Sequence, residues 1–219
     1  VILLILAFLR DGPHGPRRSS AADPVPPARS WTTRELLFHP NFWPMLVIFV
    51  PQYMATMAIG SNLAPLFADH GLTPADAALA TMLFCVVAIP GKIIIGRLSD
   101  SVDHRLLVMM SMTMYAIGFL AMLGHVSLPR MLFGYVALAL GTAGFYPMPA
   151  AIIGRHFGTD NFGRVFGLLT LFYIVAALGG PIAGAIRDHF GSYAYFQIGA
   201  AIILPLSGLM VFRLGRSQP

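Results

Sequence analysis

Six long apolar segments follow one another along most of the chain, and short polar stretches separate them. They cover residues 41–68, 75–96, 107–124, 131–154, 166–186 and 194–212. Each is long enough to cross the hydrocarbon core of a bilayer as a helix, for which about 20 apolar residues suffice. A shorter apolar run at residues 1–9 has about half that length, and we expect it to be the end of a truncated transmembrane helix. The pattern predicts an all-α polytopic membrane protein with six transmembrane helices.

The polar stretches predict how the chain enters its helices. Residues 10–40 are rich in Pro and Ser, which is typical of a flexible linker, and residues 214–219 form a short tail. Within the linker, Thr32 and Glu35 have the spacing of a capping box, so we expect a short helix on the membrane surface. The sequence Thr-Pro-Ala-Asp at 73–76 predicts the start of the second complete helix, because Thr is a good cap and Pro suits the first helical position.

Composition supports a membrane protein and narrows its possible chemistry. The chain of 219 residues is 57% hydrophobic and 11% charged, whereas soluble domains carry roughly a quarter charged residues. Lipid is therefore the expected partner, and nucleic acid is not, despite a net charge of +5. Cys85 is the only cysteine, and the histidines show no metal-binding spacing. We expect no metal, no cofactor and no enzymatic activity.

Basic residues are distributed unevenly between the two sets of alternating loops. Of the 14 Lys and Arg residues, 12 fall on the side that includes residues 10–40, 97–106, 155–165 and the C-terminus. The other side holds only Arg130 and Arg187. Because Lys and Arg accumulate on the cytoplasmic side of membrane proteins, this split places the linker and the C-terminus in the cytoplasm. The predicted location is the cell membrane, that is, a plasma or bacterial inner membrane.

A charged loop motif stands between the second and third complete segments. It contains Gly96, Leu98, Asp100 and Arg105. With these residues the chain resembles the C-terminal half of a major facilitator superfamily transporter, in which a loop of the form G-x-L-x-D-R-x-G-R-R occupies this place. Ser101 and Asp103 replace a usual basic residue and a usual glycine of that loop. Within the superfamily, residues 162–170 and 179–196 resemble the branch of monocarboxylate transporters and oxalate–formate antiporters.

The resemblance implies a function. It implies secondary transport of a small organic anion, such as a monocarboxylate, by alternating access around a cavity between two six-helix halves. An N-terminal half of the same protein is then a partner. Two features depart from this branch: Cys85 and Ile89 stand where monocarboxylate transporters carry an Asp and an Arg, and residues 166–186 contain no Lys. The alternative is a stand-alone or truncated six-span membrane protein with a structural role or without transport activity.

Polar side chains on four of the predicted helices are the candidate substrate ligands. The resemblance implies that the first, second, fourth and fifth complete helices border the cavity. The candidates on them are Gln52, Tyr53, Asn62, Thr81, Tyr146, Thr170 and Tyr173. For each, a hydrogen bond between helices is an equal alternative to substrate contact. Lys92 lies near the cytoplasmic face, where we expect its long side chain to reach the membrane surface. The alternative for Lys92 is anion binding in the transport pathway.

The same loop motif supplies candidates for a conformational switch. These are Gly96, Arg97, Asp100 and Arg105. In the resembling family the acidic residue holds basic groups and a neighbouring helix N-terminus in one state of the transport cycle. Asp100 is therefore expected to be a switch residue and not a substrate ligand. Its expected partner is Arg97, Arg164 or a group in the N-terminal half.

Overall fold

The structure is a computed structural model that describes residues 31–144, 147–158 and 160–214, apart from the side chain of Asp100, and all elements in these ranges are helical. The predicted half-helix at 1–9, the linker up to residue 30 and the tail after residue 214 lie outside the described residues. The elements are α2 (Thr33–Leu37), α3 (Phe42–Asp69), α4 (Pro74–Ser101), α5 (His104–Ala121), α6 (Leu128–Thr142), α7 (Pro147–Phe157), α8 (Phe162–Ala176), α9 (Gly179–Phe190), α10 (Ala194–Gly208) and the 3₁₀ helix η1 (Leu209–Arg213).

The predicted all-α fold with six membrane spans is confirmed. In the described part of the chain, six helical stretches are long and apolar enough to cross a membrane. Three spans are single helices, α3, α4 and α5, and three consist of two consecutive elements, α6 with α7, α8 with α9, and α10 with η1. α4 continues through Ser101, beyond the apolar segment that ends at residue 96, because charged residues at a helix end remain solvated without breaking it.

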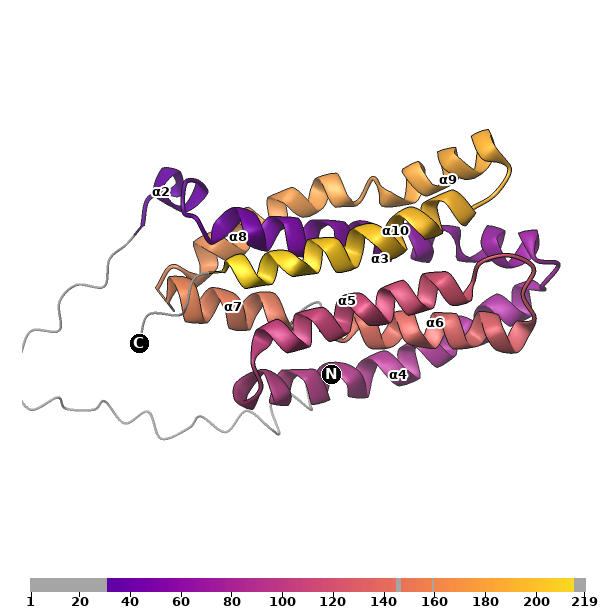
Figure 1. Ribbon diagram of the computed structural model, residues 1–219, viewed down its shortest axis with the longest axis horizontal. Helices are drawn as coiled ribbons and strands as arrows, with labels where there is room; N and C mark the ends of the chain where they lie inside the picture. Colours follow the sequence, from indigo (N-terminus) through magenta and orange to yellow (C-terminus); the bar gives the residue numbers. More distant parts are fainter. Residues whose placement is uncertain (1–30, 145–146, 159, 215–219) are drawn as a thin grey trace, which may run out of the picture.

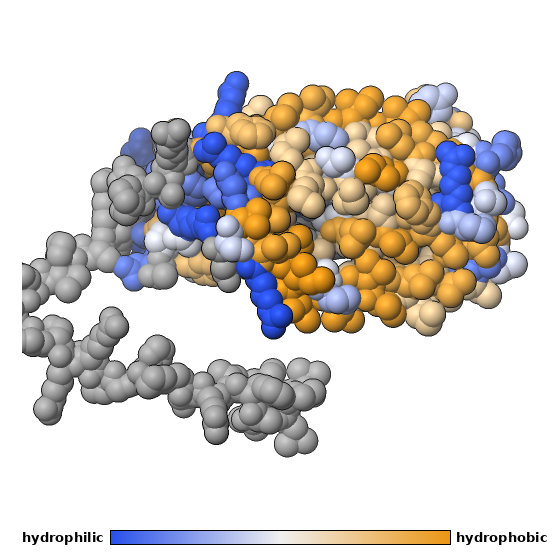
Figure 2. Space-filling model, turned by 60° about the horizontal axis from the view of Figure 1, so that its bottom comes forward, coloured by the Kyte–Doolittle hydropathy of each residue, from blue (hydrophilic) through white to orange (hydrophobic). Residues whose placement is uncertain are grey.

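The helices run lengthwise and give the molecule two distinct ends (Figure 1). α2, the α4–α5 turn and the α7–α8 turn lie at one end, which we call the basic end. The α3–α4, α5–α6 and α9–α10 turns lie at the other, which we call the opposite end. Figure 2 shows an apolar band between the two polar ends. This surface suits a bilayer, whose hydrocarbon interior is bounded on both sides by water.

Local signals in the sequence define several helix starts and turns. Thr32 and Glu35 form the predicted capping box of α2, and Thr73 and Asp76 form a second one at the start of α4. The Thr73 hydroxyl donates to Asp76 Oδ2 over 2.7 Å, and the backbone N–H of Asp76 donates to the Thr73 hydroxyl over 3.3 Å. Gly191 ends α9 in the left-handed region, with φ 71°, where a side chain would be strained.

Glycine allows the helices to approach closely. α5 crosses α6 where a Cβ on Gly118 would lie 2.8 Å from the Gly134 carbonyl oxygen. α9 begins at Gly179, directly against the backbone carbonyl of Met54 on α3. α3 also packs against α4, α8, α10 and η1, so it forms the centre of the bundle. The small residues therefore serve helix packing, as small residues commonly do in membranes.

Candidate functional site

Gln52 lies on the buried side of α3 and joins three helices. Its side chain is 1% exposed. Nε2 donates to the Ser111 hydroxyl of α5 over 3.1 Å and to the Gly141 carbonyl of α6 over 3.3 Å. The Ser111 hydroxyl also donates to the Gly141 carbonyl. Of the two interpretations of Gln52, this geometry favours the hydrogen bond between helices over substrate contact.

A second polar chain runs beside Gln52 and was not expected from the sequence. The hydroxyl of the buried Tyr115 on α5 lies 2.6 Å from the Thr56 hydroxyl on α3 and 2.9 Å from the Thr142 hydroxyl on α6. Thr56 in turn donates to the Gln52 carbonyl over 2.9 Å. The same three helices are thus joined twice. Nothing in the local sequence distinguishes these residues from other polar groups, because their partners lie 27 to 59 residues away.

Tyr53 of α3 and Tyr173 of α8 are in ring contact at the partly exposed surface between the two helices. Their ring centroids lie 4.8 Å apart, with an angle of 39° between the planes. Gly60 and Ala64 are exposed and follow Tyr53 at helical spacing, so all three share one face of α3. Thr170 is exposed one turn before Tyr173 on α8. The two tyrosines and Thr170, three of the expected substrate ligands, therefore lie on adjacent helix faces.

The remaining candidates are distributed over other parts of the bundle. Thr81 is exposed on α4, and its hydroxyl donates to the Ala77 carbonyl over 3.0 Å. The Thr170 hydroxyl likewise donates to the Phe166 carbonyl over 2.7 Å. The Thr81 and Thr170 hydroxyl oxygens can therefore still accept hydrogen bonds with their lone pairs. Tyr146 lies outside the described residues. The structure thus brings Tyr53, Thr170 and Tyr173 together and leaves Thr81 on a separate helix.

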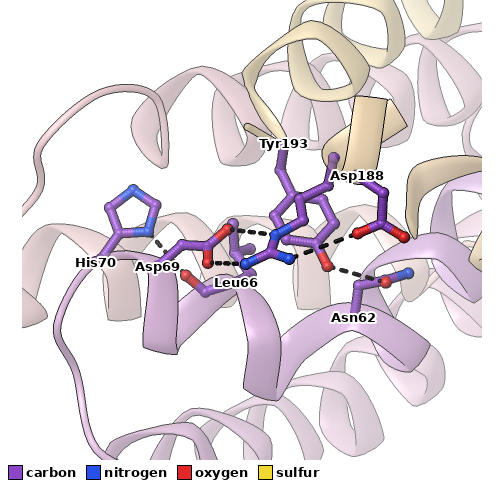
Figure 3. A network of polar contacts seen from close by, with 7 residues as sticks. Asn62, Leu66, Asp69, His70, Asp188 and Tyr193 are labelled. Carbon is purple, nitrogen blue, oxygen red and sulfur yellow. Dashed lines mark hydrogen bonds and ion pairs between the residues drawn. The ribbon is translucent and has the colours of Figure 1, made fainter. Parts of the chain in front are cut away.

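Asn62 is part of a polar network at the opposite end (Figure 3). Its Nδ2 donates to the Ala58 and Gly180 carbonyls over 2.9 and 3.0 Å, and its Oδ1 accepts from the Tyr193 hydroxyl over 3.1 Å. Burial raises the pKa of Tyr193, which keeps this phenol in the neutral form that donates. Asn62 therefore connects α3 to α9 and to the α9–α10 turn.

An ion pair completes this network and was missed from the sequence. Arg187 of α9 donates from Nη2 to Asp69 Oδ1 over 2.7 Å and from Nε to Oδ2 over 3.1 Å. Asp188 lies 3.5 Å from Nη1 of the same guanidinium. The pair joins the last residue of α3 to the last turn of α9. A separation of 118 residues hides such a pair from sequence patterns.

The candidate switch residues lie together at the basic end. Gly96, Arg97 and Asp100 occupy the last turns of α4, and Arg105 lies in the first turn of α5. Arg105 Nη2 donates to the Leu214 carbonyl over 3.2 Å. The side chain of Asp100 lies outside the described structure, so its expected contacts stay predictions.

Two other arginines surround this region. Arg155 of α7 donates from Nη2 to the Ser99 carbonyl over 2.9 Å, directly beside Asp100 in the chain. Arg164, an expected partner of Asp100, donates from Nη1 to the Trp31 carbonyl over 2.8 Å. Arg155 was not among the partners that the sequence predicts for Asp100. It is therefore an additional candidate partner for the Asp100 carboxylate.

Aromatic and histidine rings hold α2 against the basic end. The His39 ring centroid lies 4.7 Å from Trp31 and 4.8 Å from Phe157. His39 Nδ1 accepts from the Asn41 backbone N–H over 3.2 Å, and burial lowers the pKa of His39. Both effects favour the neutral ring. Among the residues that the structure describes, no group of three His, Cys, Asp or Glu side chains is arranged to hold a metal ion.

Comparison with known proteins assigns the fold to a family. The family model described as Major Facilitator Superfamily matches residues 45–219, from the beginning of α3 onwards. The chain belongs to the Major Facilitator Superfamily. The six candidate spans agree with a membrane protein of this superfamily. The predicted superfamily and the predicted multi-pass membrane protein are thereby confirmed.

The relatives are described as efflux pumps. The chain is 29% identical over 187 residues to the multi-drug resistance efflux pump PmrA in two strains of Streptococcus pneumoniae. The match covers 79% of this chain and 45% of the relative, so the chain spans about half the length of the curated relatives it matches. These relatives lend no support to the monocarboxylate and oxalate–formate branch.

Proposed function

We propose that this chain forms the C-terminal half of an alternating-access transporter that moves organic solutes across a membrane. The Tyr53–Tyr173 pair on the partly exposed faces of α3 and α8 is the observation that carries this proposal. Aromatic rings that are half-exposed at membrane depth offer an apolar face and a hydroxyl to a solute. An N-terminal half, the expected partner, would complete the cavity in front of these faces.

The substrate class follows from the chemistry on these faces. Tyr53, Tyr173, Thr170 and Thr81 offer rings and hydroxyl groups, and none of them carries a charge at neutral pH. Such a surface suits amphipathic, aromatic compounds better than small ions that must be held by an opposite charge. The relatives' description as multi-drug efflux pumps points in the same direction. Export of amphipathic organic compounds is therefore our first candidate for the activity.

A small organic anion, such as a monocarboxylate, is the second candidate, and Lys92 is the residue that favours it. Lys92 is half-buried on α4, and it is the only basic residue within the six apolar segments. A cation at membrane depth is costly and is usually retained for a function. In this alternative, Lys92 would hold the carboxylate during one step of the cycle.

The proposal also includes the orientation of the chain in the membrane and a conformational switch at the basic end. The basic end would face the cytoplasm of the cell, as the distribution of arginines favours. Asp100 would alternate between partners at this end, and Arg155 and Arg105 from neighbouring helices are within the same region. Gly96 would determine the shape of the last turns of α4 next to Asp100, and Arg97 would add a positive charge there.

Transport by the complete gene product in proteoliposomes tests the proposed function. Export of a fluorescent amphipathic dye such as ethidium supports the first candidate, and counterflow of labelled lactate or oxalate supports the second. Lactate or oxalate movement that disappears in Lys92→Gln would decide for the anion. A protein that inserts normally and moves neither class of compound would contradict the proposal.

A further inference from the structure

His70 follows the last residue of α3 and bridges two turns at the opposite end. Its Nδ1 lies 2.8 Å from the Leu66 carbonyl oxygen of α3, a contact drawn in Figure 3. Its Nε2 lies 2.9 Å from the Gly124 carbonyl oxygen in the α5–α6 turn. Both ring nitrogens therefore face oxygen atoms that accept hydrogen bonds and cannot donate them.

The protonation state of the ring decides whether both contacts are hydrogen bonds. A neutral imidazole has one N–H and would place a nitrogen lone pair against one of the two carbonyl oxygens. The imidazolium has two N–H groups and donates to both oxygens. The carbonyls at the C-terminus of α3 also carry partial negative charge, which attracts a cation.

We propose that His70 is a proton-binding site that ties the α3–α4 turn to the α5–α6 turn when protonated. Loss of the proton removes one of the two hydrogen bonds and leaves a repulsive contact in its place. The opposite end of the bundle thus responds to the pH of the compartment that it faces. This inference rests on the geometry of His70 and not on the proposed substrate or transport activity.

A cavity beside His70 gives water access to the ring. It has a volume of about 260 Å³, and its lining includes His70, Gly124, His125, Tyr193 and Gln197. Gln197 is 3% exposed, and its Nε2 has no hydrogen-bond partner among the described residues. Because water occupies about 30 Å³ in the liquid and readily accepts from a buried donor, this cavity suits several water molecules. Protons can reach His70 through it.

The charged groups around His70 limit which other groups could cause a pH effect at this end of the bundle. Asp69 is paired with Arg187, and Asp188 contacts the same guanidinium. Asp76 of α4 is held in its capping box, and Arg130 of α6 donates to the Ala121 carbonyl. Carboxylates, guanidinium groups and phenols ordinarily keep one state between about pH 5.5 and pH 8, and histidines do not. The other histidines at this end are His125 and His189, and both are exposed.

Hydrogen–deuterium exchange of the chain in lipid nanodiscs tests the proposal. The exchange rates of the peptides that cover both turns are measured at about pH 5.5 and pH 8, and the intrinsic rate at each pH is divided by the observed rate to give the protection. One ordinary hydrogen bond corresponds to a change of about three- to tenfold in protection. We expect protection to decrease at the higher pH in the wild type and in His189→Gln, which changes an exposed histidine at the same end and serves as the control. His70→Gln should show low protection at both pH values.

Two results would overturn the proposal: wild-type protection of the turns that does not change with pH, or an undiminished pH effect in His70→Gln. Peptides around Tyr115 in α5 report whether His70→Gln keeps its fold. If that variant misfolds, histidine-selective ¹⁵N spectra of the wild type decide the matter. Two protonated nitrogens on His70 at the lower pH support the proton-binding site, and a single one contradicts it.

Discussion

Arg187 Nη2 lies 2.7 Å from Asp69 Oδ1, so the end of α9 is held to the end of α3 at the opposite end of the bundle. The two side chains are 41% and 25% exposed, so water weakens their attraction. The Asn62–Tyr193 hydrogen bond lies in the same network and needs the same approach of α9 and α10 to α3. The pair therefore fixes the position of α9 relative to α3 more than it adds to overall stability.

Changing Asp69 should show this pairing directly. Asp69→Asn should lower the unfolding temperature slightly, because the guanidinium loses its charged partner. Asp69→Arg should lower it further, because two like charges then meet. Adding Arg187→Asp to Asp69→Arg should restore most of the loss. Thermal unfolding in detergent measures the series, and Asp188→Asn, whose carboxylate is largely exposed, is the control. Equal effects of Asp69→Asn and Asp188→Asn would contradict the pairing.

Gln52 should contribute to stability and not to substrate affinity. Gln52→Ala removes two hydrogen bonds and leaves Ser111 and the Gly141 carbonyl with fewer partners. The free energy of unfolding should fall by about 1 to 2 kcal/mol, with an unchanged KM for transport. Chemical unfolding and transport kinetics measure the two quantities. Unchanged stability combined with a raised KM would show instead that Gln52 contacts substrate.

The contact of α2 with the basic end should weaken in acid. Burial lowers the pKa of His39 below its ordinary value, so the undocked segment binds a proton before the docked one does. Docking is therefore strongest above the ordinary histidine pKa of about 6.5 and is lost as the pH falls through the lowered value. Protease cleavage within α2, followed against pH, measures this. His39→Gln should remove the pH dependence, and cleavage that is equally slow in acid and base would contradict the expectation.

Asp100 should affect the rate of the transport cycle and not membrane insertion. Asp100→Asn removes the charge that we expect to alternate between basic partners, so transport should slow while protein yield stays normal. Asp160→Asn changes an exposed acid in the α7–α8 turn of the same end and serves as the control. Transport rates in proteoliposomes separate the two variants. A wild-type transport rate in Asp100→Asn would show that this loop only connects α4 to α5 and has no role in the transport cycle.

The sequence predicts the spans well, because each depends on a continuous apolar run and on local caps. The Thr73–Asp76 box and the turn at Gly191 are examples in which neighbouring residues alone determine the structure. Gly179 lies inside a span and packs closely against Met54, as small residues inside membrane spans commonly do.

The candidate site was less predictable, because its contacts join residues that are far apart in the chain. Gln52 and Tyr53 are neighbours with similar polarity, yet one is buried between α5 and α6 and the other is partly exposed beside α8. Their different roles depend on helix rotation, which six strongly apolar spans leave undetermined. The Asp69–Arg187 pair depends in the same way on which helix ends meet.

Transport of ethidium by the complete gene product with Tyr53→Ala or Tyr173→Ala tests the central proposal most directly. Because both rings lie on the face that we assign to the pathway, each change should raise KM by about tenfold, a loss of roughly 1.4 kcal/mol in binding. Tyr195→Ala removes an exposed tyrosine of α10 and should leave KM unchanged. A wild-type KM in both pathway variants, or an equal rise in Tyr195→Ala, would contradict the account.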